Sequence, residues 1–281
     1  MNIAQALEKG ATSLRDGGIP EPEREASLLL RLVMKCDAAF VIAHPEHRLD
    51  AVQSILFKAV LKRRAAHEPF QYISGKQEFY GLEFDVSPEV LIPRPETEIL
   101  VEAAVDRFKG VESFRFLEIG VGSGCISVAL LANLPNATSI GVDISEQALA
   151  VAQKNAEKHG VSDRLNLIRS DLFKNVPEEQ FDAIFSNPPY IPGADIETLQ
   201  PEVRDKEPRS ALDGGVDGLD IVRSIIGGSV KFLKPPGVLM IEIGFGQSEA
   251  VSGLVDTSSW QTPDFLKDLQ GIDRIVVAIK K

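Results

Sequence analysis

The sequence has few cysteines, few histidines and no long apolar run. Only two of its 281 residues are cysteines, Cys36 and Cys125, which is too few for a disulfide framework and typical of a reducing compartment. The four histidines are scattered along the chain, so no metal site is predicted. No apolar run approaches the roughly 20 residues that span a bilayer, and we expect no membrane association.

The chain also lacks excess positive charge, and we expect no targeting segment. Lysine and arginine number 30 against 41 aspartates and glutamates, a net charge of −11. Tight binding of nucleic acid needs clustered cations, so we expect no direct nucleic-acid partner, although this total does not exclude a local basic patch. The first residues carry acidic side chains early and have no apolar signal region, which predicts a cytoplasmic protein.

Helical periodicity characterises residues 1–72, which we interpret as a small helical domain. Apolar residues recur at helical spacing in 3–18, 21–35 and 50–68. In the third segment the predicted apolar face consists of Val52, Ile55, Leu56, Val60 and Leu61. Residues 73–92 change to alternating apolar positions around a Tyr-Gly turn, which predicts a β-hairpin linker.

Strands and helices alternate in the remaining segment, residues 93–281. A helix is predicted from Pro95, and apolar strand candidates follow. This pattern predicts an α/β, Rossmann-like domain whose mainly parallel sheet has helices on both faces, with ligands at the carboxyl ends of the strands. The strand candidates are FRFLEIG, TSIGVDI, LNLIRSD, FDAIFSN, GVLMIEIG and RIVVAIK.

The first of these strands ends in a glycine loop, LEIGVGSGCIS. Gly120, Gly122 and Gly124 allow a tight turn and leave room for a ligand beside main-chain N–H groups. A dinucleotide fingerprint would require glycine at position 125, which is Cys125, and no Lys-Ser/Thr pair follows to make a P-loop. The remaining pattern, E-x-G-x-G-x-G, resembles the first motif of class I S-adenosylmethionine-dependent methyltransferases.

That resemblance implies cofactor contacts at the ends of the next two strands. Asp143 would accept hydrogen bonds from the two ribose hydroxyls, Asp171 would meet the adenine amino group, and Leu172 would pack on the adenine face. The alternative readings are a helix start for Asp143 and a simple cap-and-core role for the other two. The complete predicted cofactor site comprises Gly120, Val121, Gly122, Ser123, Gly124, Asp143, Asp171, Leu172 and Asn187.

The segment SNPPYIP, residues 186–192, ends the fourth strand with two prolines that cannot join a sheet ladder. It is either a plain strand terminator or a rigid clamp for a small planar group. No base or cysteine is present for an oxygen or carbon acceptor. An amide or aromatic-amine nitrogen instead needs acceptors for its N–H groups, which Asn187 Oδ1 and the Pro188 carbonyl can supply while Tyr190 stacks on the planar group.

The N-P-P-Y tetrapeptide resembles amino-methyltransferases that act on DNA adenine, rRNA guanine or protein glutamine. Together with the segment 68–102 and EPRSALDGGVDGLD, it closely resembles the release factor glutamine methyltransferase family, PrmC or HemK. Ribosomal-protein glutamine methyltransferases carry Pro-Arg-Ser-Pro where this chain has Pro93-Arg94-Pro95-Glu96, which favours the release-factor branch. Leu172 departs from family members that have an aromatic residue there.

The resemblance implies a seven-stranded sheet and a monomeric enzyme that methylates the glutamine of the Gly-Gly-Gln loop in class 1 release factors. S-adenosylmethionine would become S-adenosylhomocysteine, and residues 1–72 would dock the release factor. The alternatives are another protein glutamine, a nucleic-acid base, or a non-enzymatic scaffold. The predicted glutamine pocket is Asn187, Pro188, Pro189 and Tyr190, with Asn187, Pro188 and Tyr190 catalytic and Glu118, Arg94, Thr97 and Glu98 supporting the site.

Overall fold

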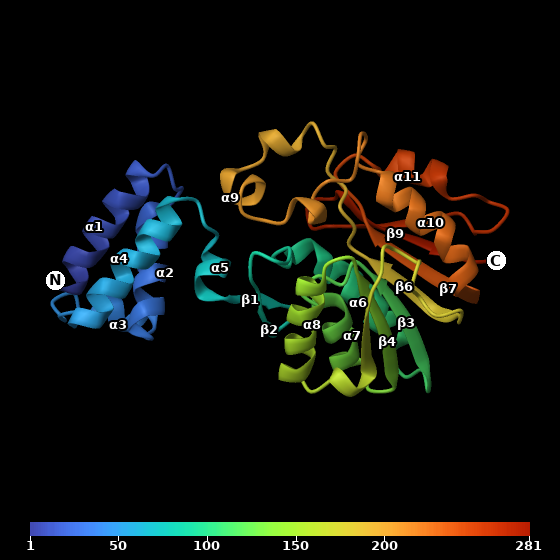
Figure 1. The fold of residues 1–281 in the computed structure, drawn as a ribbon, viewed down its shortest axis with the longest axis horizontal. Coiled ribbons are helices and arrows are strands. Elements are labelled where there is room, and N and C mark those ends of the chain that lie inside the picture. Colours follow the sequence, from blue (N-terminus) through green and yellow to red (C-terminus); the bar gives the residue numbers. More distant parts are fainter. The chain divides into compact units, whose positions relative to one another are not determined.

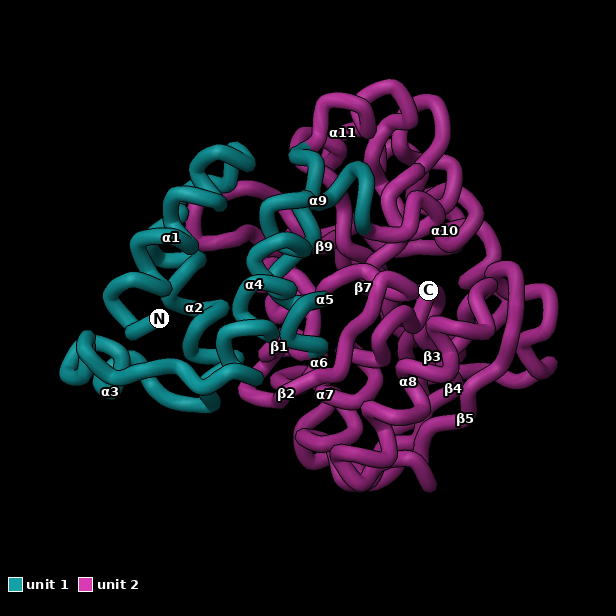
Figure 2. The backbone as a smooth tube through the Cα atoms, turned by 60° about the vertical axis from the view of Figure 1, so that its left-hand side comes forward, with its two compact units in different colours: residues 1–75, 200–206 teal, residues 76–199, 207–281 magenta.

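The chain divides into two units, and the division does not follow sequence order. The computed structural model describes residues 1–281. One unit consists of residues 1–75 together with 200–206, and the other of residues 76–199 and 207–281 (Figure 2). A short segment from the middle of the second half of the sequence therefore belongs to the N-terminal unit.

The smaller unit is helical. Asn2 and Asp50 begin α1 and α4, and each exchanges hydrogen bonds with a glutamine three residues later in a capping box. The buried Arg64 joins α4 to the rest of the unit, because its Nε donates to Glu25 at 2.7 Å and its Nη1 lies 2.8 Å from Glu202. The helices are α1 (Ile3–Asp16), α2 (Pro22–Met34), α3 (Ala38–Ala43), α4 (Ala51–Ala65), α5 (Phe70–Ser74) and α9 (Pro201–Arg204).

The predicted apolar face of α4 is wrong at three positions. Val52, Ile55 and Leu56 are 64%, 68% and 47% exposed, whereas Phe57 and Leu61 are buried. Apolar side chains are spread around this helix, so their spacing alone does not define which side is buried. The large Phe57 ring, one turn before Leu61 on the same side, packs against α1 and α2 and decides the orientation.

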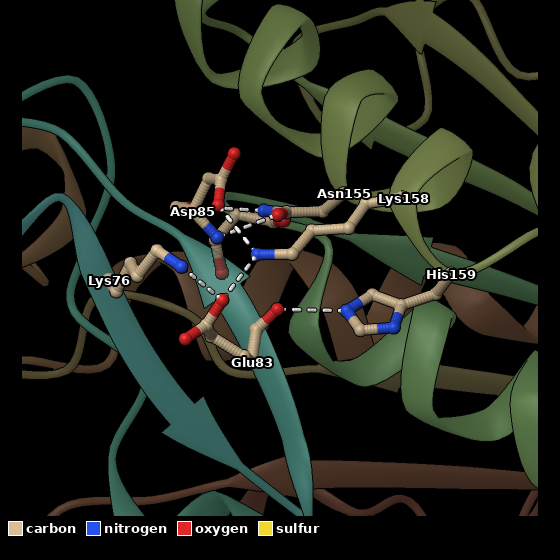
Figure 3. A network of polar contacts seen from close by, with 7 residues as sticks. Lys76, Glu83, Asp85, Asn155, Lys158 and His159 are labelled. Atoms are coloured by element: carbon tan, nitrogen blue, oxygen red, sulfur yellow. Dashed lines mark hydrogen bonds and ion pairs between the residues drawn. The ribbon is translucent and has the colours of Figure 1, made fainter.

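A β-hairpin opens the larger unit, with β1 (Lys76–Phe79) paired antiparallel to β2 (Leu82–Asp85). The hairpin is tied to helix α8 (Glu146–Lys158), as Figure 3 shows. The buried Asn155 accepts a hydrogen bond from the Asp85 amide at 2.8 Å and donates one to the Asp85 carbonyl at 2.9 Å. Lys158 forms ion pairs with Glu83 and Asp85 at the surface.

The sheet of the larger unit has seven strands in the order β5-β4-β3-β6-β7-β9-β8 (Figure 1). The five strands from β5 to β7 are parallel, and β9 runs antiparallel to both of its neighbours. The predicted mainly parallel sheet is confirmed. The strands are β3 (Phe114–Ile119), β4 (Ala137–Asp143), β5 (Leu165–Arg169), β6 (Phe181–Ser186), β7 (Leu233–Glu242), β8 (Asp264–Lys267) and β9 (Asp273–Ile279).

Helices cover both faces of the sheet. Successive residues of a strand point to opposite faces, so each strand contributes side chains to two cores. Phe116 of β3 belongs to the core that includes α6 and α7, and its neighbour Leu117 belongs to the core that includes α10 and α11. Trp260 lies buried in the second core. None of the helices combines the length and apolar character needed to cross a membrane. The remaining helices are η1 (Pro95–Thr97), α6 (Glu98–Phe108), α7 (Cys125–Asn133), η2 (Ser162–Arg164), η3 (Ile196–Thr198), η4 (Arg209–Ala211), α10 (Asp220–Phe232) and α11 (Ser248–Leu254).

Candidate functional site

A cavity of about 410 Å³ opens at the carboxyl ends of the central strands, where ligands of such sheets bind. The glycine loop after β3, the end of β4, the turn after β5 and the Asn-Pro-Pro segment after β6 all contribute to its wall. Distant motifs of the sequence thus meet around one space. The predicted site residues that line it are Thr97, Glu118, Gly120, Val121, Gly122, Ser123, Asp143, Asp171, Leu172, Asn187, Pro188 and Pro189.

The glycine loop has a backbone that side chains rarely tolerate. Gly120 and Gly122 have φ angles of +75° and +53°, and no atom lies within 4 Å of where their side chains would project. Their missing side chains leave open space beside the main chain. A side chain at Gly124 would lie 3.2 Å from Ala152 of α8, and Gly124 does not line the cavity, so its contact with a cofactor stays a prediction. Gly124 therefore allows two helices to pack closely.

Asp143 holds the end of β4 against the glycine loop. One oxygen of its carboxylate accepts a hydrogen bond from the Gly122 amide, and the other accepts one from the Ser145 amide, both at 2.9 Å. Burial raises the pKa of Asp143, and these backbone amides oppose that shift. Each oxygen keeps a second lone pair, so the carboxylate can accept further hydrogen bonds from a ligand in the cavity.

The turn after β5 presents Asp171 and Leu172 to the cavity. Leu172 has a φ of +51°, an unusual conformation for a bulky side chain, and its carbonyl accepts a hydrogen bond from Ser170 Oγ at 2.8 Å. Asp171 forms an exposed ion pair with Lys174 at 2.6 Å. The contacts of these two residues with adenine stay predictions.

Glu118 is the buried acid of the glycine-loop motif. It is 1% exposed, lines the cavity, and accepts hydrogen bonds from both the amide and the hydroxyl of Ser127. Burial raises the pKa of Glu118 to about 8, the Ser127 hydrogen bonds oppose this, and the Asp143 charge adds to it. Glu118 is therefore a buried carboxyl group at the cavity wall that Ser127 holds in place.

Asn187 lies at the cavity wall with its amide in a defined orientation. Its Nδ2 donates to Thr97 Oγ1 at 3.0 Å, and Thr97 Oγ1 donates to Glu242 Oε2 at 2.5 Å. No group of the protein donates to Asn187 Oδ1, and this atom is not buried. The side-chain oxygen of Asn187 is therefore an available acceptor at the cavity.

The other residues of the Asn-Pro-Pro-Tyr segment divide between the cavity and the interior. Pro188 and Pro189 line the cavity, but Tyr190 does not. The Tyr190 hydroxyl donates to Glu242 Oε1 at 3.2 Å, and burial raises the pKa of Tyr190 above its usual value. Stacking of Tyr190 on a substrate stays a prediction.

Arg94 and Glu98, which were predicted to support the site, do not line the cavity. Arg94 forms an ion pair of 2.6 Å with the buried Glu207, whose carboxylate also accepts from the Ile92 amide. Glu98 accepts a hydrogen bond from the Tyr80 amide in the hairpin turn at 2.8 Å. Both side chains anchor the backbone on either side of Thr97, which does reach the cavity.

The segment 207–220 forms part of the cavity wall through Pro208, Ser210 and Ala211. The Ile191 amide donates to the Leu212 carbonyl at 3.0 Å, so this segment is joined to the chain just after the Asn-Pro-Pro-Tyr segment. These three lining residues were not among the predicted site residues.

Glu242 is a further residue that the sequence motifs did not identify. It ends β7, is 1% exposed, and accepts from both Thr97 and Tyr190. The available signal was an acid inside the apolar strand MIEIG, at the carboxyl end where the other motifs lie. No group of three or more histidine, cysteine, aspartate or glutamate side chains is arranged to hold a metal ion.

Most of the chain is similar to proteins of known families. Residues 5–75 match the family described as the PrmC N-terminal domain, and residues 95–202 match the methyltransferase small domain. The chain is 44% identical over 274 residues to the release factor glutamine methyltransferase of Geobacter sulfurreducens, covering 98% of this chain and 95% of that one. It is 44% identical over 279 residues to that of Cereibacter sphaeroides, covering 99% and 98%.

Solved structures share the fold at low sequence identity. A methyltransferase from Pyrococcus furiosus is 17% identical with a TM-score of 0.53, covering 78% of this chain and 98% of its own. The catalytic domain of hMettl16 is 17% identical with a TM-score of 0.59, covering 76% of this chain and 80% of its own. These likenesses indicate a methyltransferase-like fold for the larger unit.

Proposed function

The chain belongs to the release factor glutamine methyltransferase family, and we propose that it methylates the side-chain amide nitrogen of the glutamine in the Gly-Gly-Gln loop of class 1 release factors. The methyl donor would be S-adenosylmethionine, with S-adenosylhomocysteine as the product. Support comes from full-length relatives that carry this name and from a cavity bordered by an amide oxygen, Asn187 Oδ1, that no protein group donates to.

The cavity wall fits the proposed methyl donor. Gly120 and Gly122 leave space beside the main chain, and Asp143 offers free lone pairs to paired hydroxyls such as those of a ribose. Glu118 adds a buried acid that favours a positively charged ligand. When bound, the cofactor supplies a methyl group on a positively charged sulfur. These four residues, with Val121, Ser123, Asp171 and Leu172, would hold it.

Asn187 carries the proposed chemistry. A carboxamide nitrogen is a poor nucleophile because its lone pair is delocalised, and no nearby residue is a suitable base for it. Asn187 Oδ1 and the Pro188 carbonyl can instead accept from its two N–H groups and hold it in line for transfer. The supporting observation is the hydrogen bond from Asn187 Nδ2 to Thr97, which turns Oδ1 away from Thr97.

The proposed acceptors act mainly by positioning the reacting nitrogen. As that nitrogen gains positive charge, its N–H groups become stronger donors, and each hydrogen bond of this kind contributes about 1.5–3 kcal/mol. Once the sulfur–methyl bond has broken and the nitrogen–methyl bond has formed, the cationic nitrogen is acidic enough to release one proton to water. Correct alignment of two reactants contributes more, roughly 7–11 kcal/mol. A rigid turn with two prolines suits this role better than a titrating side chain would.

The helical unit is proposed to bind the release factor, since residues 5–75 match a domain named for this family. This unit does not contribute to the lining of the cavity. Binding of the large substrate and binding of the reacting side chain would thus be separate properties of the two units.

Mass spectrometry of a purified class 1 release factor tests the proposal. After incubation with the enzyme and isotopically labelled S-adenosylmethionine, we expect one labelled methyl group on the glutamine of the Gly-Gly-Gln loop. A release factor with glutamate at that position is the matched control and should stay unmodified. Labelling of rRNA, DNA or a ribosomal protein in parallel reactions, without labelling of the release factor, would contradict the proposal.

A further inference from the structure

Glu242 sits behind the cavity rather than in its wall. Its carboxylate is buried at the end of β7, and each of its oxygens accepts one hydroxyl hydrogen bond: Thr97 Oγ1 donates to Oε2 at 2.5 Å and Tyr190 donates to Oε1 at 3.2 Å. Both donors are connected to Asn187. Thr97 accepts a hydrogen bond from Asn187, and Tyr190 belongs to the same turn as Asn187. Glu242 therefore contacts the ligand space only through other side chains.

The ionisation of Glu242 decides the direction of this hydrogen-bond chain. A carboxylate can only accept, so the single hydrogen of the Thr97 hydroxyl must point to Glu242. The Thr97 oxygen is then restricted to accepting, and the group it faces on Asn187 must be the NH₂ end of the amide. The opposite end, Oδ1, is consequently directed away from Thr97. One buried negative charge thus determines which end of Asn187 is presented at the cavity.

We propose that Glu242 is a positioning residue for methyl transfer, which holds Thr97 and Tyr190 as donors and so keeps Asn187 Oδ1 as the acceptor for the substrate amide. This inference rests on the proposed function of the cavity, and it adds a specific requirement for a negative charge at position 242.

The charged and titratable groups around Glu242 come from several elements. The negative charge of Glu96 in η1 raises the pKa of Glu242, and the positive charge of Arg274 in β9 lowers it. The charge of Glu242 in turn raises the pKa values of Tyr190 and Cys125. The positive charge of Arg94 lowers the pKa of Tyr190. Burial raises the pKa of Glu242 to about 7, which its two hydrogen bonds partly oppose. A protonated Glu242 can donate to Thr97, which leaves the Thr97 hydrogen free for Asn187 Oδ1. Turnover should therefore decline as the pH falls through about 7.

The test compares Glu242→Gln with wild-type enzyme, using intact release factor as substrate. We expect kcat to fall roughly 10- to 100-fold, the effect of losing one hydrogen bond to a charged group, while the calorimetric Kd for S-adenosylmethionine changes little. Because glutamine does not titrate, the acid limb of the kcat–pH profile should disappear in the variant. A residue that served stability alone would change the unfolding temperature but would leave the shape of this profile intact.

Thr97 provides an independent pair of variants if Glu242→Gln does not fold. Thr97→Val removes the hydroxyl that links Glu242 to Asn187 and should lose as much kcat as Glu242→Gln, whereas Thr97→Ser restores the hydroxyl and should rescue most of the loss. A wild-type kcat in Thr97→Val would overturn the proposal, as would an unchanged acid limb in Glu242→Gln. Wild-type enzyme that fails to methylate any release factor would instead overturn the proposed function itself.

Discussion

Asp143 accepts a hydrogen bond of 2.9 Å from the Gly122 amide, which joins the end of β4 to the loop after β3. This contact gives the carboxylate a structural role in addition to the ribose binding that we propose for it. The Ser145 amide occupies the other oxygen and begins α8. The same side chain thus shapes the glycine loop and offers lone pairs to a ligand.

Replacing Asp143 should weaken cofactor binding before it affects the chemical step. We expect Asp143→Ala to raise the Kd for S-adenosylmethionine roughly 10- to 100-fold, because at least one hydrogen bond to a charged group is lost. Isothermal titration calorimetry gives this value directly. Asp163→Ala, at an exposed position outside the cavity, is the control and should bind normally. An unchanged Kd in Asp143→Ala would refute the ribose contact.

Replacing Asn187 should stop the chemical step while leaving cofactor binding nearly unchanged. Asn187→Ala removes the acceptor oxygen at the cavity, so methyl transfer to a release factor should be abolished while cofactor affinity stays within a few-fold. Single-turnover assays and calorimetry on the same preparation separate the two quantities. Asn133→Ala is a matched control, because Asn133 caps the end of α7 by donating to the Ala129 carbonyl and does not line the cavity. Retained turnover in Asn187→Ala would argue against its proposed role.

Glu118 should make the folded protein less stable as the pH rises. Its pKa is about 8 in the folded state and about 4.5 when unperturbed, so between these values the folded protein holds a proton that the unfolded chain has lost. The free energy of unfolding should therefore decrease with increasing pH across this window, by on the order of a few kcal/mol. Ionisation of Glu242 should also decrease the free energy of unfolding as the pH rises to about 7.

Urea unfolding at several pH values tests this expectation. Glu118→Gln cannot ionise, so its unfolding free energy should decrease less steeply between pH 4.5 and 8 than that of the wild type. Glu112→Gln changes an exposed glutamate and should keep the wild-type slope. Identical slopes for all three proteins would mean that Glu118 ionises normally in the fold.

Asn155 and Lys158 both join α8 to the hairpin, but we expect very different effects on stability. Asn155 is fully buried and bonds to Asp85 and to the Ser123 carbonyl in the glycine loop, at 2.8–2.9 Å. Asn155→Ala leaves several buried backbone groups unpaired, which should cost about 3 kcal/mol or more. Lys158→Ala removes ion pairs whose partners are about half exposed, and should cost no more than about 1 kcal/mol.

Chemical denaturation of the two variants measures this difference. Asn155→Ala should also reduce cofactor affinity, since Ser123 lines the cavity and loses its hydrogen bond. Equal destabilisation by the two substitutions would contradict the view that the buried amide, rather than the surface ion pairs, holds the hairpin in place (Figure 3).

The parts of the fold that were predicted from sequence depend on local patterns. The apolar strands and the glycine loop each involve residues close together in the chain, and the structure confirms them. The short edge strand β8 is not predicted from the sequence, because its four residues are partly buried or exposed and form no apolar run. The predicted buried face of α4 is wrong at three positions because apolar residues surround that helix.

The hydrogen-bond chain behind the cavity could not be predicted in the same way. Thr97 and Glu242 are 145 positions apart in sequence, and the significance of Glu242 depends on two hydroxyl donors from different segments. A sequence shows that an acid ends a buried strand, but it does not show which donors fold against it. Only the packing of η1, the turn after β6 and the end of β7 brings these side chains together.

The position of Glu202 also has a consequence for synthesis of the protein. Arg64 is buried in the helical unit and pairs with Glu25, which precedes it, and with Glu202, which is translated much later. A nascent chain that has emerged only as far as α5 lacks one of these two carboxylates. The first unit to leave the ribosome thus acquires its full set of charge partners only after most of the sheet has been translated.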